Sequence, residues 1–165
     1  MHIERLFSVP LGIGEVDVDN QSLIDYVLQY KDQRLSDINY HSEYEDTYLP
    51  PNEITNTIVN KVIQDFYDKG ETDLVCTGMW SHIHEKNMST NWHTHHKCFS
   101  AVVYYVSVPE GSGDLVLRRH DQPKVSLTPK QGNYICFPGW LEHMVTRNET
   151  DQIRISISFN LNHGH

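Results

Sequence analysis

The chain has 165 residues, which is long enough to bury one hydrophobic core, and its length predicts a single domain over residues 1–165. Its net charge of −9 repels phosphate backbones, and no basic patch offsets it, so nucleic acid is not an expected partner. The N-terminus shows no signal segment and no apolar run approaches membrane-spanning length, which favours a cytoplasmic protein without a membrane partner.

Two helices and one short strand are expected in the first 73 residues. The strand covers residues 6–9, and the helices cover residues 20–30 and 52–69, with a polar loop over residues 31–47 between them. Asp19 or Asn20 can cap the first helix, and Gly70 can end the second.

From residue 74 onward the apolar residues alternate as they do in strands, with Gly, Pro and Asn at short intervals. The expected strands cover residues 74–83, 99–108, 113–118, 132–137, 143–145 and 152–161. Helices followed by strands predict an α+β domain that is mostly β. Residues 1–73 would form a helical N-terminal support, and residues 74–161 would form a jelly-roll core with its site between the sheets.

Three histidines are candidate metal ligands. His93 and His95 occupy alternate positions of an extended segment, so their side chains point the same way, and His143 can complete one face of the ion. Imidazoles suit Fe(II) and also Zn, Ni and Cu. His96 is the rival to His95, but adjacent strand residues point to opposite faces, so His96 would pair poorly with His93.

Past these histidines, Arg154 begins a β-branched strand and Ser156 follows on the same face. An arginine in a core-facing strand needs an anionic partner to be tolerable. A guanidinium beside a hydroxyl can hold a carboxylate, so the pair predicts an anion site next to the metal. A structural Asp or Glu is the alternative partner.

These segments resemble the Fe(II)- and 2-oxoglutarate-dependent oxygenases, in particular the prolyl-4-hydroxylase-like branch and the small oxygenases of bacteria and phages. The resemblance covers about residues 80–161. It rests on His93-Thr94-His95, the strand over residues 102–106, residues 132–138 leading to His143, and Arg154-Ile155-Ser156.

The resemblance implies a double-stranded β-helix, cupin-like, that is braced by the N-terminal helices. It also implies that His93, His95 and His143 hold Fe(II), and that Arg154, Ser156 and Tyr105 bind 2-oxoglutarate as a small-molecule cosubstrate. Tyr104, the neighbour of Tyr105, should face the other way.

The implied activity is that of a hydroxylase, a dioxygenase that uses O₂ and couples decarboxylation of 2-oxoglutarate to succinate with oxidation of an unidentified substrate. The resemblance favours a protein or peptide substrate, such as a prolyl residue. The usual second ligand of this superfamily is Asp or Glu, whereas this chain has His95. Two alternatives therefore stay open: a three-histidine dioxygenase of cupin type without 2-oxoglutarate, and a non-catalytic metal- or ligand-binding jelly roll.

Overall fold

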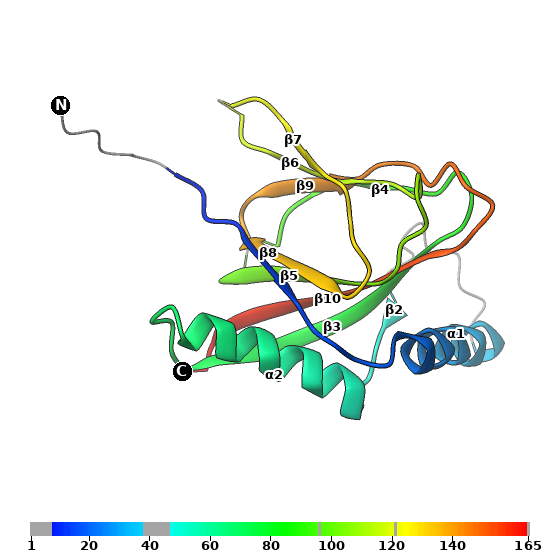
Figure 1. The fold of residues 1–165 in the computed structure, drawn as a ribbon, viewed down its shortest axis with the longest axis horizontal. Coiled ribbons are helices and arrows are strands. Elements are labelled where there is room, and N and C mark those ends of the chain that lie inside the picture. Colours follow the sequence, from blue (N-terminus) through cyan, green and yellow to red (C-terminus); the bar gives the residue numbers. More distant parts are fainter. Residues whose placement is uncertain (1–7, 38–46, 96, 121, 165) are drawn as a thin grey trace.

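The structure, a computed structural model, describes residues 8–37, 47–95, 97–120 and 122–164. It has three layers: two helices cover one face of a six-stranded sheet, and a four-stranded sheet faces the other (Figure 1). Every strand pair in both sheets is antiparallel. The predicted fold class, a mostly β jelly roll braced by N-terminal helices, is confirmed.

The two helices begin at polar caps. Helix α1 (Asn20–Asp37) starts after Asp19, whose carboxylate accepts hydrogen bonds from the amide and hydroxyl of Ser22 at 3.1 and 2.7 Å. Helix α2 (Glu53–Tyr67) starts with a capping box in which Asn52 and Thr55 satisfy each other's backbone amides. Helix α1 runs past the predicted end at residue 30, because residues 31–37 contain no Gly or Pro to break it.

The larger sheet has the order β1-β8-β5-β10-β3-β2. Its strands are β1 (Gly12–Glu15), β8 (Asn133–Pro138), β5 (Ser100–Ser107), β10 (Arg154–His163), β3 (Leu74–His84) and β2 (Thr47–Tyr48). The smaller sheet has the order β4-β9-β6-β7, formed by β4 (Thr90–His93), β9 (Glu142–Val145), β6 (Leu115–Arg118) and β7 (Val125–Leu127). The six strands expected after residue 73 are all present, whereas β2, β4 and β7 were not among the expected strands, although the segment of His93 in β4 was expected to be extended.

The first strand lies later than predicted. Residues 6 and 7 fall outside the described part of the chain, residues 8–11 are irregular, and the strand β1 begins at Gly12. β1 lies against β8 so closely that a Cβ on Gly12 or Gly14 would collide with the side chains of Cys136 or Tyr134. The absence of side chains at these two glycines therefore allows this strand to pair with β8.

Alternation along β10 divides the interior into two cores. Ile155, Ile157 and Phe159 belong to the core beneath the helices, which the side chain of Tyr104 joins. The other face of the sheet meets the smaller sheet around Tyr105 and an apolar cluster, formed by Ala101, Val103, Leu115, Leu117, Ile135, Phe137 and Leu141. The polar residues of β10 share this second face, so they lie inside the jelly roll.

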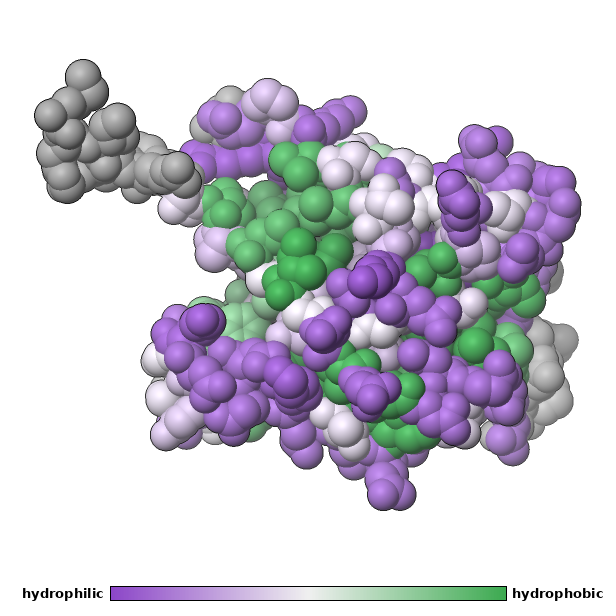
Figure 2. Space-filling model, viewed as in Figure 1, coloured by the Kyte–Doolittle hydropathy of each residue, from purple (hydrophilic) through white to green (hydrophobic). Residues whose placement is uncertain are grey.

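On the face shown in Figure 2, an apolar area lies between the N-terminal segment and the β6–β7 hairpin. A groove of about 530 Å³ runs there, and its apolar lining includes Val9, Leu11, Leu117, Val125 and Leu141. It shares no lining residue with the groove at the histidines described below. Neither described helix is long and apolar enough to cross a membrane.

Candidate metal and carboxylate site

The structure brings His93, His95 and His143 together. Their potential ligand atoms all lie within 4.8 Å of one another. His93 ends β4 and is the cross-strand partner of His143 in β9, with ring centroids 4.1 Å apart. His95 lies beyond the end of β4, and its ring centroid is 5.3 Å from that of His93 and 5.1 Å from that of His143. The separations are close to those that three ligands of one ion require.

An oxygen atom contacts the Nδ1 atom of each of the three rings. The partners are the carbonyl of Asn91 for His93 at 2.8 Å, the carbonyl of Leu141 for His143 at 2.9 Å, and the side-chain oxygen of Asn160 for His95 at 2.8 Å. A neutral ring that donates from Nδ1 carries its lone pair on Nε2. Ligating histidines commonly have this arrangement, which sets the tautomer and the ring orientation.

His143 is the most deeply buried of the three, at 5% exposure, and its ring meets Phe137 edge-on at 4.7 Å. Burial, reinforced by His93, lowers the pKa of His143 from its usual 6.5 to about 3, although the hydrogen bond to Leu141 opposes the shift. His143 is therefore neutral near pH 7, which is the form that binds metals. A donor set of three imidazoles fits Fe(II).

Arg154, Ser156 and Tyr105 lie together inside the jelly roll. Nη1 of Arg154 donates to the hydroxyl of Ser156 at 3.1 Å, and the guanidinium carbon lies 5.6 Å from the centre of the Tyr105 ring. Ser156 of β10 is the cross-strand partner of Tyr105 in β5. All three side chains are almost wholly buried, with at most 2% exposure. The three residues predicted to bind an anion thus lie together.

This site holds a buried cation that has no ion-pair partner among the described residues. Within the described part of the chain, Nε of Arg154 and the hydroxyl of Tyr105 make no hydrogen bond, and no carboxylate forms an ion pair with Arg154. Burial lowers the pKa of Arg154, opposed by the nearby Tyr105 and by Asp114, and burial raises the pKa of Tyr105. Arginine nevertheless stays protonated in proteins. An uncompensated buried guanidinium is costly, so this arrangement fits a carboxylate that arrives from outside the chain.

Three further side chains at the site were not predicted as site residues. His84 and His82 of β3 are the cross-strand partners of Arg154 and Ser156, and both histidines are buried. The indole nitrogen of Trp80 donates to Nε2 of His82 at 2.9 Å, and its ring stacks on His95 at 5.3 Å with an interplanar angle of 18°. Their alternation, Trp80-x-His82-x-His84, was the available sequence signal, because alternate strand residues share a face.

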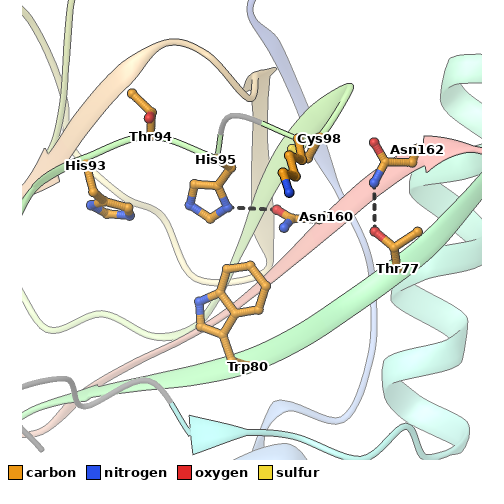
Figure 3. Close-up of a pocket in the computed structure, with 9 residues that line it drawn as sticks. Thr77, Trp80, His93, Thr94, His95, Cys98, Asn160 and Asn162 are labelled. Atoms are coloured by element: carbon orange, nitrogen blue, oxygen red, sulfur yellow. Dashed lines mark hydrogen bonds between the residues drawn. The ribbon is translucent and has the colours of Figure 1, made fainter.

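A groove of about 600 Å³ opens from His93 and His95 towards the end of β10 (Figure 3). Figure 3 shows Asn160 at the edge of the His95 ring and Trp80 below the ring, with Asn162 and Thr77 farther along. The groove is lined by Thr77, Trp80, His93, Thr94, His95, Lys97, Cys98, Asn160 and Asn162. No carboxylate is among these residues, and Lys97 is the one formal cation.

Gly139 holds the segment of His95 against the rest of the site. The amide of His95 donates to the carbonyl of Gly139 at 2.7 Å, and a Cβ on Gly139 would collide with the carbonyl oxygens of His95 and Cys98. Because Gly139 has no side chain, the loop that carries His95 can lie close to the end of β8.

Glu142 does not supply a carboxylate to the histidines. Its oxygens accept from Nε and Nη2 of Arg118 at 2.8 and 3.3 Å. The extended backbone points it away from the side of His143, as alternation requires. His96, the rival to His95, lies outside the described residues.

The comparisons with known proteins identify the same class of fold. A family model described as "Putative 2OG-Fe(II) oxygenase" matches residues 117–160. A viral collagen prolyl hydroxylase from Paramecium bursaria chlorella virus-1, solved with 2OG, is similar at 13% identity with a TM-score of 0.69, covering 93% of this chain and 96% of that one. A Pseudomonas putida prolyl-4-hydroxylase is similar at 11% identity and a TM-score of 0.66, covering 93% and 88%.

A 2OG-Fe(II) oxygenase family protein from Burkholderia pseudomallei has 17% identity and a TM-score of 0.59, and the match covers 69% of this chain but only 60% of that one. No curated protein matches this chain. The family model matches a part of the chain that carries His143 and Arg154-Ile155-Ser156 of the predicted motifs, and the solved structures share the predicted fold.

Proposed function

We propose that this member of the 2OG-Fe(II) oxygenase family binds Fe(II) through His93, His95 and His143 and binds 2-oxoglutarate through Arg154, Ser156 and Tyr105. The observation that carries the proposal is the buried guanidinium of Arg154, which has no anionic partner among the described residues and lies inside the same jelly roll as the three histidines. The distal carboxylate of 2-oxoglutarate would supply the missing charge.

The residues have separate tasks in this proposal. Three neutral imidazoles leave both positive charges of Fe(II) in place, so they favour a dianionic cosubstrate at the metal. Arg154 and Tyr105 orient the far end of the cosubstrate and exclude water from it. When bound, iron and 2-oxoglutarate supply the redox chemistry, in which O₂ is consumed and the cosubstrate is decarboxylated to succinate.

The groove beside His93 and His95 is the proposed substrate approach. It reaches from the histidines to the surface, and it is an open groove of mixed polar and apolar lining rather than an enclosed apolar cavity. Amide and hydroxyl groups along it, from Asn160, Asn162 and Thr77, suit the carbonyls and amides of a peptide. We therefore propose a peptidyl substrate such as a prolyl residue, the substrate class that the names of two similar solved structures state for those proteins.

We further propose that residues 1–165 act as one domain. Helices α1 and α2, from the predicted support over residues 1–73, share the core beneath the six-stranded sheet with β3, β5 and β10 of the predicted jelly-roll segment, residues 74–161. Both parts of the chain therefore contribute to the core beneath the six-stranded sheet.

An anaerobic titration tests the cosubstrate and metal together. Adding Fe(II) and then 2-oxoglutarate to the protein should produce the visible charge-transfer absorption of a chelated cosubstrate, and admission of O₂ should yield succinate. Substrate oxidation without added 2-oxoglutarate would favour the three-histidine cupin-type reaction, to which the histidine set is also suited. Cosubstrate binding without succinate under any peptide would favour the non-catalytic binding protein.

The adjacent tyrosines allow a matched test of the carboxylate site. We expect Tyr105→Phe to weaken 2-oxoglutarate binding by roughly tenfold, the lower end for a hydrogen bond to a charged group of about 1.5 kcal/mol. The melting temperature of the ligand-free protein should not fall, because the lost hydroxyl has no partner among the described residues. Calorimetry and thermal unfolding measure the two effects.

Tyr104→Phe is the control for that variant. The Tyr104 hydroxyl donates to the side chain of Asn20 at 2.9 Å on the helix side of the sheet. Its loss should leave 2-oxoglutarate affinity unchanged and lower the free energy of unfolding by about 1 kcal/mol. Equal loss of affinity in both variants would contradict the assignment of Tyr105.

His95→Asp tests the effect of the third histidine on turnover. The variant adds the carboxylate that is usual in this superfamily, so we expect more uncoupled 2-oxoglutarate turnover per bound iron than in the wild type. Its metal affinity should be lower, because a shorter side chain loses the contacts of His95 with Asn160 and Trp80. His95→Ala is the control, and turnover per iron no higher in His95→Asp than in the wild type would contradict the charge argument.

A further inference from the structure

The candidate ligand His95 differs from the other two in its backbone. His93 belongs to β4 and His143 to β9, where cross-strand pairing holds each of them in register. His95 lies past the end of β4, in a segment without regular secondary structure. A ligand on such a segment needs side-chain contacts to hold its ring at the metal.

Two residues of the opposite sheet contact the His95 ring. Oδ1 of Asn160 in β10 lies 2.8 Å from Nδ1, and the Trp80 ring of β3 stacks on the imidazole at a centroid distance of 5.3 Å (Figure 3). The first contact sets the tautomer and the second sets the tilt of the ring. Asn160 and Gly78 are cross-strand partners, and a Cβ on Gly78 would lie 3.7 Å from the Trp80 ring, so both contacts arise from one stretch of rigid sheet.

Trp80 also connects this ligand to the carboxylate site. Its indole N–H donates to His82, which lies beside Ser156, and Ser156 accepts from Arg154. The amide of Asn160 is neutral, so it orients His95 without adding negative charge to the metal. Together these contacts are specific for an imidazole, because neither a stacked ring nor an Nδ1 donor exists in a carboxylate ligand.

We infer that Asn160 and Trp80 are positioning residues that hold His95 in place as a metal ligand. The surroundings of this ligand position are therefore arranged for a histidine, and not for the Asp or Glu that is usual in the superfamily. The inference rests on the proposed function in that it requires metal binding by the three histidines. Asn160 acts on the metal only through His95. Removing the side-chain oxygen of Asn160 should therefore release His95 from the metal. His93 and His143 should stay bound, because their Nδ1 contacts are to other residues.

The experiment measures Co(II) affinity and the number of coordinated imidazoles by X-ray absorption. Asn160→Leu should lower the affinity about 10- to 100-fold, as is usual on loss of an outer-shell partner, and should reduce the count from three imidazoles to two. Asn160→Asp keeps the acceptor and adds a charge, so it should bind Co(II) more tightly than the wild type and keep three imidazoles. Trp80→Leu should lower affinity without altering the partner of Nδ1.

Asn162→Leu is the matched control. Asn162 lies two residues along the same strand and makes its hydrogen bonds to Thr77 and the amide of Phe99, away from the histidines. The Asn162→Leu protein should be less stable than the wild type, but its Co(II) affinity should be unchanged and its Co(II) should still be coordinated by three imidazoles. Three results would each overturn the inference. The first is an Asn160→Leu protein that keeps three imidazoles and the Co(II) affinity of the wild type. The others are an Asn160→Asp protein that binds Co(II) more weakly than the wild type, and an Asn162→Leu protein that loses as much Co(II) affinity as Asn160→Leu.

The same measurement separates this inference from the proposed function. A wild-type protein that binds no Co(II) through histidines would refute the proposed metal site itself. A wild type with three imidazoles, together with an unaltered Asn160→Leu, would refute only the positioning role. If Asn160→Leu does not fold, Asn160→Asp and Trp80→Leu decide the question.

Discussion

Replacing His143 with alanine is expected to remove metal binding almost completely. His143 is the most buried of the three histidines, and its ring contacts those of His93, His95 and Phe137. The affinity for Fe(II) or Co(II) should fall more than about a hundredfold, which exceeds the loss caused by removing an outer-shell partner. Metal content after anaerobic reconstitution, together with circular dichroism to verify folding, measures the effect.

Two histidines outside the triad provide controls for this variant. His120→Ala removes a side chain that is 88% exposed, and His96→Ala removes the sequence neighbour that competes with His95 in the motif. Both should retain the metal. A His96→Ala protein that loses the metal, with a His95→Ala protein that keeps it, would show that the wrong member of the pair has been assigned.

Replacing Arg154 with methionine is expected to uncouple cosubstrate binding from metal binding. A charge-assisted arginine–carboxylate contact is worth about 1.5–3 kcal/mol, so affinity for 2-oxoglutarate should fall roughly tenfold to a hundredfold. Metal affinity should change little. The ligand-free variant should be as stable as the wild type or more stable, because methionine removes a buried cation that has no ion pair with any described residue.

Calorimetry on metal-loaded protein and thermal unfolding of the ligand-free protein test both parts. Arg147→Met is the control, since Arg147 is exposed and should affect neither property. Equal 2-oxoglutarate affinity in Arg154→Met and wild type would refute the cosubstrate site and leave a three-histidine metal site with another chemistry. A large loss of stability would instead indicate that Arg154 has a structural anionic partner.

The sequence predicted the site best where strand alternation governs side-chain direction. Arg154 and Ser156 lie on one face of β10, and Tyr105 and Tyr104 point to opposite sides of the sheet, as expected. The same rule could have found Asn160, because Arg154, Ser156, Ser158, Asn160 and Asn162 are polar at alternate positions between apolar residues. The Arg154-Ile155-Ser156 motif covers only the start of β10, so it gives no indication of Asn160 near the end of the strand.

Element ends were predicted less well where the decisive interaction is distant. Pro10 and Gly12 suggested the end of a strand, whereas the lack of side chains at Gly12 and Gly14 lets β1 pair with β8, more than a hundred residues away in the chain. Helix α1 continues past residue 30 because polar composition alone does not end a helix. The short strand β2 exists because it pairs with β3 and forms the edge of the sheet, which local propensity does not encode.

The sequence by itself determined the class of fold, the spacing of His93 and His95, and the identity of the cation and hydroxyl in β10, because periodicity and side-chain chemistry are local properties. Only the tertiary structure decided that Arg154 is buried without an ion-pair partner among the described residues, and that Asn160, 65 residues from His95, lies against its ring. Such facts depend on which strands become neighbours and on how closely the two sheets approach, and both follow from the packing of the whole domain.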